Sequence, residues 1–327
     1  MSTIPTRPFG RHADPISALG FGGHHLGEAD DQATATKLVR TAIDGGVSFF
    51  DNCWEYHRGK SEAWMGNALK GVRSKVFLMT KVCTHGRDKD LAMRMLEESL
   101  RRLQTDHLDL WQIHGVSFDN DAELFIRPNG AAEALTEAKR QGKVRYVGFS
   151  GHKDPSIHLS MLATGFAFDS VQMPLNAFDS QFRSFEQRVL PELNRRGIAA
   201  LGMKSLQGKG DAILKGAIGV EDALRYAMSL PVTSTITGIE KLDVLQQNLK
   251  IAQGFQPMSK ADMERVRKNV AEYAADGRFE LYKTSIKYDN PESRMSHQFP
   301  IDMEQAEVKE MMTATENTGH PYPRLEK

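Results

Sequence analysis

One stretch of the chain decides the expected fold: Val47-Ser48-Phe49-Phe50-Asp51-Asn52-Cys53-Trp54-Glu55-Tyr56-His57. Its apolar beginning follows Gly45 and Gly46 and is typical of a strand buried on both faces. The apolar run ends abruptly in the carboxylate of Asp51, which we therefore expect at the carboxyl end of that strand. An unpaired carboxylate is costly to bury, so Asp51 needs a cationic partner from elsewhere in the chain.

Similar apolar segments recur along the chain at a spacing of roughly thirty residues, and each is followed by a helical pattern. This alternation predicts an α/β fold, a single-domain (β/α)8 TIM barrel. A doubly wound sheet is the competing arrangement. It is disfavoured because the segment 20–25 lacks the third glycine of a dinucleotide fingerprint and no helix is expected to begin there. The expected strands are 15–22, 47–51, 75–82, 107–114, 144–150, 170–173, 198–203 and 232–237, and the clearest helices are 30–44, 61–69, 91–103, 131–141 and 242–252.

The barrel is expected to occupy residues 7–277, and an extra C-terminal helix packs on its outside. Ser259 and Asp262 resemble a capping box at the start of that helix. Residues 278–327 form a C-terminal extension, for which three interpretations stay open: a lid, a subunit contact or a disordered tail. A short helix is expected over 302–312 within it.

The composition excludes several classes of protein. The 327 residues contain 42 basic and 42 acidic side chains, which gives no general attraction to nucleic acid or to an anionic membrane. Two cysteines are too few for a disulfide framework or a four-cysteine metal site. No segment resembles a signal peptide or a membrane span, so we expect a cytoplasmic protein. The sequence leaves the oligomeric state open.

Three neighbouring strands are expected to direct Asp51, Lys81 and His114 into one space, because the carboxyl ends of parallel barrel strands meet at one face. The same alternation places Val47, Phe49, Phe77, Met79, Leu110 and Gln112 inward below them. Tyr56 lies five residues beyond Asp51. A tyrosine has a pKa of about 10, and a nearby cation would lower it. We expect Lys81, held by Asp51, to be that cation and Tyr56 to act as a general acid. His114 can donate a hydrogen bond to the same substrate oxygen. Since no nucleophile is evident, a hydride would have to come from a cofactor.

Asp51, Tyr56, Lys81 and His114 at these strand ends resemble the catalytic tetrad of the aldo-keto reductases, and the resemblance covers about residues 7–252. It implies an NAD(P)H-dependent oxidoreductase that reduces a small aldehyde or ketone substrate. The implied cofactor is NADP(H), with NAD(H) as the alternative. The resemblance also implies cofactor contacts: Ser150, His152 and Gln172 at the nicotinamide carboxamide, Met203 where many members stack an aromatic ring, Lys204-Ser205-Leu206 at the pyrophosphate, and Thr237-Gly238-Ile239, Lys241 and Gln247-Asn248 at the adenosine end.

Two departures from the family pattern affect the cofactor. His152 follows Ser150 and Gly151 where members usually place an asparagine directly after the serine. Val244 stands where many members hold the 2′-phosphate of NADP with a basic residue, and Lys241 is the nearby substitute. The expected preference for NADPH over NADH therefore rests on the family resemblance and not on the residues of this chain.

The substrate pocket is expected to contain His24, His25, Trp54 and Phe118, although ordinary loop packing is nearly as good an interpretation for the last two. Cys53 and Cys83 follow neighbouring strand ends. We expect buried inert thiols, with a redox-responsive pair as the alternative.

Two rival functions remain open. A metal-dependent barrel hydrolase could use His24 and His25 with Lys81 and His114. It is weaker because adjacent histidines on an extended chain point to opposite sides, and the last strand ends in Thr237 and Gly238 rather than a carboxylate ligand. A nicotinamide-binding regulatory subunit with little turnover is the other rival.

Overall fold

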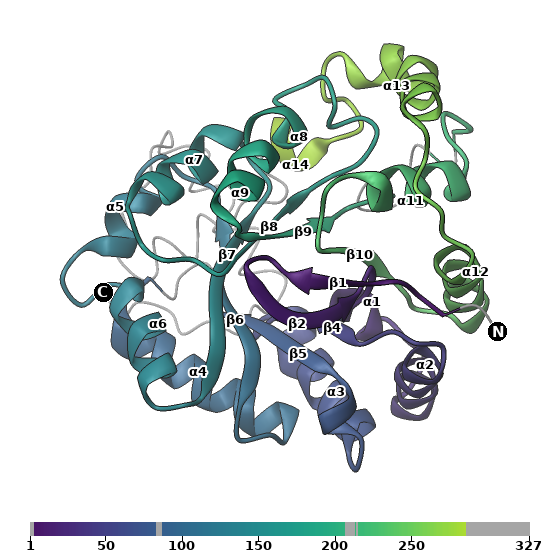
Figure 1. Cartoon of the computed structure of the whole chain (residues 1–327). Coiled ribbons are helices and arrows are strands. Elements are labelled where there is room, and N and C mark those ends of the chain that lie inside the picture. Colours follow the sequence, from purple (N-terminus) through teal and green to yellow (C-terminus); the bar gives the residue numbers. More distant parts are fainter. Residues whose placement is uncertain (1–2, 83–86, 207–212, 214, 286–327) are drawn as a thin grey trace, which may run out of the picture.

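The computed structural model describes residues 3–82, 87–206, 213 and 215–285. Eight parallel strands close into a barrel, and helices surround it as an outer ring (Figure 1). The strands are β3 (Leu19–Gly22), β4 (Phe49–Asp51), β5 (Phe77–Val82), β6 (Leu108–Val116), β7 (Val144–Gly151), β8 (Ser170–Pro174), β9 (Ala199–Met203) and β10 (Ser234–Gly238). They pair in chain order, and β10 closes the barrel against β3. The predicted (β/α)8 fold is therefore confirmed.

The outer ring consists mainly of amphipathic helices whose apolar faces pack on the strands. Several begin at an aspartate that accepts hydrogen bonds from the first free amides: Asp31 from Thr34, Asp88 from Leu91 and Asp154 from Ser156. The longer helices are α2 (Gln32–Asp44), α3 (Lys60–Leu69), α4 (Lys89–Leu103), α6 (Ala131–Arg140), α7 (Pro155–Ala163), α9 (Leu190–Arg196), α11 (Val220–Ser229), α12 (Leu242–Gln253) and α13 (Lys260–Ala274). Short helical segments are α1 (Gly23–Leu26), η1 (Tyr56–Gly59), η2 (Arg73–Lys75), α5 (Asp121–Ile126), α8 (Phe185–Arg188) and α14 (Leu281–Thr284).

The N-terminal segment corrects the predicted first strand. Residues 15–22 belong to two different strands, because β1 (Thr6–Phe9) and β2 (His12–Ser17) form an antiparallel hairpin and the barrel strand β3 begins only at Leu19. The hairpin crosses the end of the barrel in Figure 1. Its Phe9 is fully buried, and the Phe9 ring centroid lies 5.0 Å from that of Phe77 and 4.9 Å from that of Tyr146. The hairpin therefore closes the end of the barrel opposite the strand carboxyl ends.

The apolar side chains divide into two cores. One fills the barrel interior and the other lies between the strands and the helices. Alternation was predicted correctly for most inward positions, but Val47 lies before β4 and packs in the outer core. The interior core comprises Phe9, Ile16, Phe49, Phe77, Met79, Leu110, Ala199, Leu201 and Ile236.

The capping box before α13 is confirmed, because the Ser259 hydroxyl accepts a hydrogen bond from the Asp262 amide at 3.1 Å. The chain then continues into α14, where Tyr282 and Lys283 are buried against the barrel. The boundary at residue 278 stays a prediction. The proposed helix over 302–312 and the rest of the extension beyond Ser285 lie outside the described residues.

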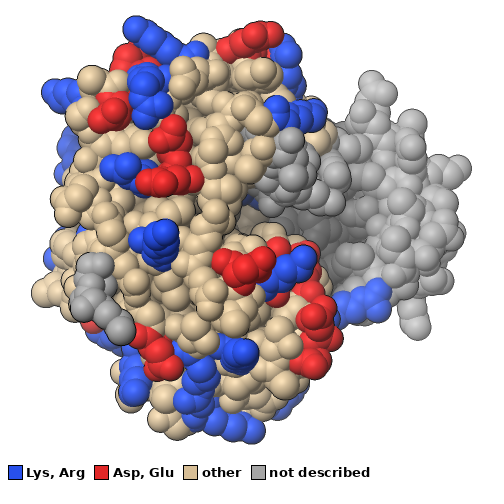
Figure 2. Space-filling model, turned by 90° about the vertical axis from the view of Figure 1, so that its right-hand side faces the viewer, with Lys and Arg blue, Asp and Glu red and all other residues tan. Residues whose placement is uncertain are grey.

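The surface carries both signs of charge. Figure 2 shows basic and acidic side chains interspersed over one face of the molecule, in keeping with the equal totals of 42 basic and 42 acidic residues. Within the described part of the chain, no helix combines the length and the apolar character needed to cross a membrane.

Candidate active site

The structure supplies the partner that Asp51 requires. The Lys81 ammonium donates to Asp51 Oδ1, and also to the Asn52 carbonyl oxygen at 2.8 Å. Lys81 and Asp51 are 1% and 4% exposed, so the ion pair is removed from bulk water. The second carboxylate oxygen of Asp51 accepts a hydrogen bond from Gln172 Nε2 at 3.2 Å. Three strands, β4, β5 and β8, thus hold a buried charge pair at the barrel mouth.

Tyr56 meets this pair from the first turn of η1. Its hydroxyl oxygen lies 3.4 Å from Lys81 Nζ, and the same ammonium lies 5.0 Å from the centre of its ring. His57 and Arg58 follow with φ values of 50° and 59°, so the chain turns sharply directly after the tyrosine. This turn helps to position the Tyr56 ring over the ends of the strands.

The expected lowering of the Tyr56 pKa is wrong for this structure. Burial raises the pKa of Tyr56 well above its usual value, and the nearby Asp51, Cys53 and Glu55 raise it further. Lys81 does not reverse this shift because its ammonium is already in contact with the Asp51 carboxylate. The phenol therefore keeps its proton at neutral pH, as a proton donor must.

His114 lies at the same mouth, with its ring edge-on to Tyr56 at a centroid distance of 5.8 Å. Its Nδ1 atom lies 2.6 Å from Glu55 Oε1 and 3.3 Å from Cys53 Sγ. Sequence reasoning missed Glu55. The available signal was its position, since it is the one acidic residue between Asp51 and Tyr56.

Cys53 is fully buried, and burial raises the pKa of its thiol well above the usual value. An unreactive thiol is therefore favoured at this position. The predicted partner Cys83 lies outside the described residues, so the redox pair stays a prediction.

The two histidines after β3 lie on the short helix α1 rather than on extended chain. The expectations that no helix begins there and that the two rings diverge are therefore wrong: the His24 and His25 ring centroids are 5.3 Å apart. His24 also lies 5.1 Å from the Tyr56 ring and 5.0 Å from the His57 ring. The His24 side chain is 52% exposed, but desolvation of its inner side, followed by nearby His25 and His57, lowers its pKa to about 3, so the ring is neutral at physiological pH.

The metal-hydrolase interpretation gains little from this geometry. His24, His25 and Glu28 have their ligand atoms within 4.8 Å of one another, but His24 and Glu28 are solvent-exposed. Lys81, which that interpretation also used, is in contact with Asp51 instead.

Trp54 contacts helix α4, and its place in the substrate pocket stays a prediction. Its indole nitrogen donates to Glu98 on α4 at 2.8 Å, and the Arg102 guanidinium lies 5.0 Å from its ring centre. The side chain therefore packs on the outer helix layer. Phe118 is half-buried just before α5, and its place in the pocket stays a prediction.

Gln172, one of the predicted nicotinamide residues, lies beside the Asp51–Lys81 pair. Gln172 Nε2 bonds Asp51 and lies 3.8 Å from Met203 Sδ. Within the described part of the chain, Gln172 Oε1 is buried without a hydrogen-bond partner. Among the described residues, the Ser150 hydroxyl makes only a long contact, 3.5 Å, to the Ile113 carbonyl oxygen. Since buried polar atoms are nearly always paired, the Gln172 oxygen fits a ligand that donates a hydrogen bond.

A second unpaired oxygen lies at the predicted adenosine end. Asn248 Nδ2 donates to Thr237 Oγ1 at 3.3 Å, whereas Asn248 Oδ1 is buried with no partner among the described residues. Ile239 is buried behind Gly238, while Lys241, the residue that precedes α12, and Gln247 are exposed.

Tyr282, which sequence reasoning also missed, joins the predicted pyrophosphate loop to the C-terminal segment. The ammonium of Lys204 lies 5.1 Å from the Tyr282 ring, and Asn176 Nδ2 donates to the Tyr282 hydroxyl at 3.1 Å. His152 Nδ1 lies 3.4 Å from the Tyr282 carbonyl oxygen. Burial lowers the pKa of Lys204 to about 8, and Ser205 and Leu206 follow it in the chain.

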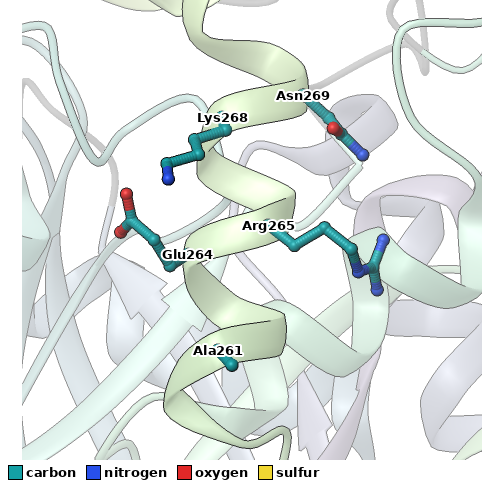
Figure 3. Close-up of a pocket in the computed structure, with 5 residues that line it drawn as sticks. All are labelled: Ala261, Glu264, Arg265, Lys268 and Asn269. Carbon is teal, nitrogen blue, oxygen red and sulfur yellow. The ribbon is translucent and has the colours of Figure 1, made fainter.

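A separate surface depression lies on the exposed side of α13, outside the barrel (Figure 3). None of the predicted site residues belongs to it. It is lined by Ala261, Glu264, Arg265, Lys268 and Asn269.

Known proteins resemble this chain over most of the barrel. Residues 18–211 match the model of the Aldo/keto reductase family. The uncharacterized oxidoreductase YqkF of Bacillus subtilis (strain 168) is 25% identical over 281 residues, which cover 72% of this chain and 87% of YqkF. The methylglyoxal reductase YeaE of Escherichia coli (strain K12) is 35% identical over 136 residues, which cover 41% of this chain and 45% of YeaE.

Solved structures share the fold. The holo form of aldo-keto reductase AKR11C1 from Bacillus halodurans superposes with a TM-score of 0.69 at 24% identity, covering 81% of this chain and 96% of that protein. An aldo-keto reductase from Klebsiella pneumoniae in complex with NADPH gives a TM-score of 0.68 at 22% identity, covering 85% and 98%.

Proposed function

Because the chain belongs to the aldo/keto reductase family, we propose that it is an NADP(H)-dependent reductase of small aldehydes or ketones. The observation that carries the proposal is the position of the Tyr56 hydroxyl, 3.4 Å from an ammonium that is itself held by a buried carboxylate. This arrangement suits the transfer of a proton to an oxygen on which negative charge develops.

Tyr56 is the proposed proton donor. Burial keeps its phenol protonated, since its pKa is raised. Once the proton has left, the phenolate would lie beside the Lys81 ammonium, which stabilises it. Asp51 holds the Lys81 ammonium in place through their buried ion pair. The same three groups serve the reverse reaction, in which the phenolate accepts a proton.

His114 is proposed to orient the substrate carbonyl. Its ring lies edge-on to Tyr56 at the mouth, so the two side chains can approach one oxygen from different sides. The walls of the proposed pocket include His24, His25 and Phe118. His24 is neutral, since its pKa is about 3, so it adds a polar ring without a charge beside Tyr56.

The residues present fit a nicotinamide dinucleotide. NADP(H) supplies a hydride when it is bound. Gln172 Oε1, which has no partner among the described residues, offers an acceptor suited to a carboxamide N–H, and Asn248 Oδ1 offers one at the opposite end of the proposed site. Ser150 and His152 complete the proposed carboxamide contacts. Met203, Lys204, Ser205 and Leu206 line the middle of the proposed site, and Thr237, Gly238, Ile239, Lys241 and Gln247 complete the adenosine end.

Support for NADP(H) rather than NAD(H) comes from relatives. The Klebsiella pneumoniae aldo-keto reductases were solved with NADP and acetate and with NADPH. In this chain Lys241 precedes α12 with an exposed side chain and is the proposed contact for the 2′-phosphate. Fluorescence titration with NADPH and NADH tests this preference. Binding of NADH that is as tight as that of NADPH, or tighter, would refute it.

The function is tested by following NADPH oxidation with a panel of aldehydes, ketones and quinones. We expect turnover with the wild-type chain and a loss of about 10²–10⁴-fold in Tyr56→Phe, the usual contribution of a general acid. NADPH should bind Tyr56→Phe as it binds the wild type. Substantial remaining turnover in a stopped-flow assay would overturn the proton-donor assignment, and a wild type inactive on the whole panel would overturn the proposed activity.

A further inference from the structure

Glu55 makes a close contact in the barrel mouth that the catalytic scheme above does not use. Its Oε1 atom lies 2.6 Å from Nδ1 of His114, and each of the two side chains is 19% exposed. A carboxylate can only accept a hydrogen bond, so the hydrogen between these atoms belongs to His114 Nδ1. The contact therefore fixes which ring nitrogen carries a hydrogen.

Cys53 contacts the same ring nitrogen and fits the same assignment. Its sulfur lies 3.3 Å from His114 Nδ1 and 3.6 Å from the Lys81 carbonyl oxygen. Burial raises the pKa of the Cys53 thiol, and Glu55 raises it further, so the S–H is retained. The thiol donates to the Lys81 carbonyl, which leaves its sulfur facing the His114 ring as an acceptor.

This tautomer has a consequence for the other ring nitrogen. A neutral imidazole carries a single hydrogen, so with Nδ1 protonated the Nε2 atom is only an acceptor. His114 Nε2 has no hydrogen bond to any residue in the described ranges. To donate a hydrogen bond to a substrate oxygen, the ring must carry both hydrogens and a positive charge.

Charged groups of both signs surround such an imidazolium. Lys81 lies on the neighbouring strand, and the Arg87 guanidinium donates to the His114 carbonyl oxygen at 3.0 Å. His152 is near enough to interact electrostatically with His114, but burial lowers its pKa well below the usual value, so it is neutral. Asp51 is engaged by Lys81. Glu55 is therefore the carboxylate placed to balance the charge of His114.

We propose that Glu55 is a positioning residue for His114. Its carboxylate holds the Nδ1 hydrogen, fixes the ring plane and provides the countercharge that lets Nε2 donate to the carbonyl oxygen. The catalytic part of this inference rests on the proposed reductase function, whereas the hydrogen bond itself does not.

The hydrogen bond is tested without any assay of activity. The chain labelled with 15N-histidine is studied by NMR, and the His114 signals are identified by their loss in His114→Gln. We expect Nδ1 to carry a hydrogen in the wild type. In Glu55→Ala the distribution of hydrogens between Nδ1 and Nε2 of His114 should change. A wild-type His114 without a hydrogen on Nδ1 would overturn the proposal, whether or not the chain is a reductase.

The catalytic role is tested by a double-mutant cycle with NADPH and a carbonyl that the wild type reduces. Glu55→Gln should lower kcat by about tenfold to a hundredfold, the range expected for losing a charge-assisted hydrogen bond, with little change in NADPH affinity. In the His114→Gln background the same change should have little further effect, because Glu55 acts through His114. If the loss of kcat in the double variant equals the product of the losses in the two single variants, the two residues act independently and the proposed role is contradicted.

Glu137→Gln on α6 is the matched control. Glu137 also forms a carboxylate ion pair, with Arg140, but it does so on the helical surface. Its replacement should leave kcat unchanged. If the wild type reduces no carbonyl while the NMR result is as expected, the proposed function fails and the positioning of His114 stands.

Discussion

Replacing Lys81 with methionine tests the centre of the proposed mechanism. Lys81 Nζ lies 3.4 Å from the Tyr56 oxygen, and two unit charges at that distance interact by about 5 kcal/mol at an effective dielectric constant of about 20. This value is an upper limit for the support that Lys81 gives to a phenolate, because Asp51 shares the ammonium. After that discount we expect kcat to fall by roughly a thousandfold.

The same substitution also affects folding, so the two effects must be separated. Asp51 is 4% exposed and would lose its cation, which typically costs about 3–5 kcal/mol of unfolding free energy. The double variant Lys81→Met with Asp51→Asn removes both charges and should regain most of that stability. It should not regain activity, since the phenolate still lacks a cation.

The measurements are urea unfolding and single-turnover NADPH oxidation on the wild type, the single variant and the double variant. A double variant that is stable and inactive supports the reasoning. A stable double variant with turnover within tenfold of the wild type would show that Lys81 serves folding alone.

Two further predictions concern the buried charges that hold the C-terminal segment. Lys283 is fully buried between Asp179 and Glu280 at 2.6 Å and 3.0 Å, so Lys283→Met should lower the unfolding free energy by about 3–5 kcal/mol, whereas Lys89→Met in an exposed pair should cost less than about 1 kcal/mol. Equal losses by urea unfolding would contradict this difference. Burial raises the pKa of Asp179 to about 7, so its contribution to stability is complete below about pH 4 and is lost as the pH rises towards 7. The free energy of unfolding, measured between pH 5 and 7.5, should fall with rising pH in the wild type and fall less in Asp179→Asn. Identical pH dependence in the two proteins would refute the assignment of this loss to Asp179.

The sequence by itself determined the barrel and most of the proposed catalytic centre. Period-two alternation is local, and parallel strands must bring their carboxyl ends to one face, so Asp51, Lys81 and His114 could be placed together before any coordinates. The capping of α13 by Ser259 was equally predictable because it needs only neighbouring residues.

Only the tertiary structure decided contacts that depend on loop geometry and on distant segments. Trp54 and Glu55 are adjacent, yet Trp54 packs on α4 while Glu55 meets His114. Tyr282 follows the last barrel strand by more than forty residues and still lies beside Lys204. The direction of a Tyr56 pKa shift likewise depends on burial, which composition and spacing do not report. Loop conformation and burial arise from packing of the whole chain, whereas strand alternation arises within a few residues.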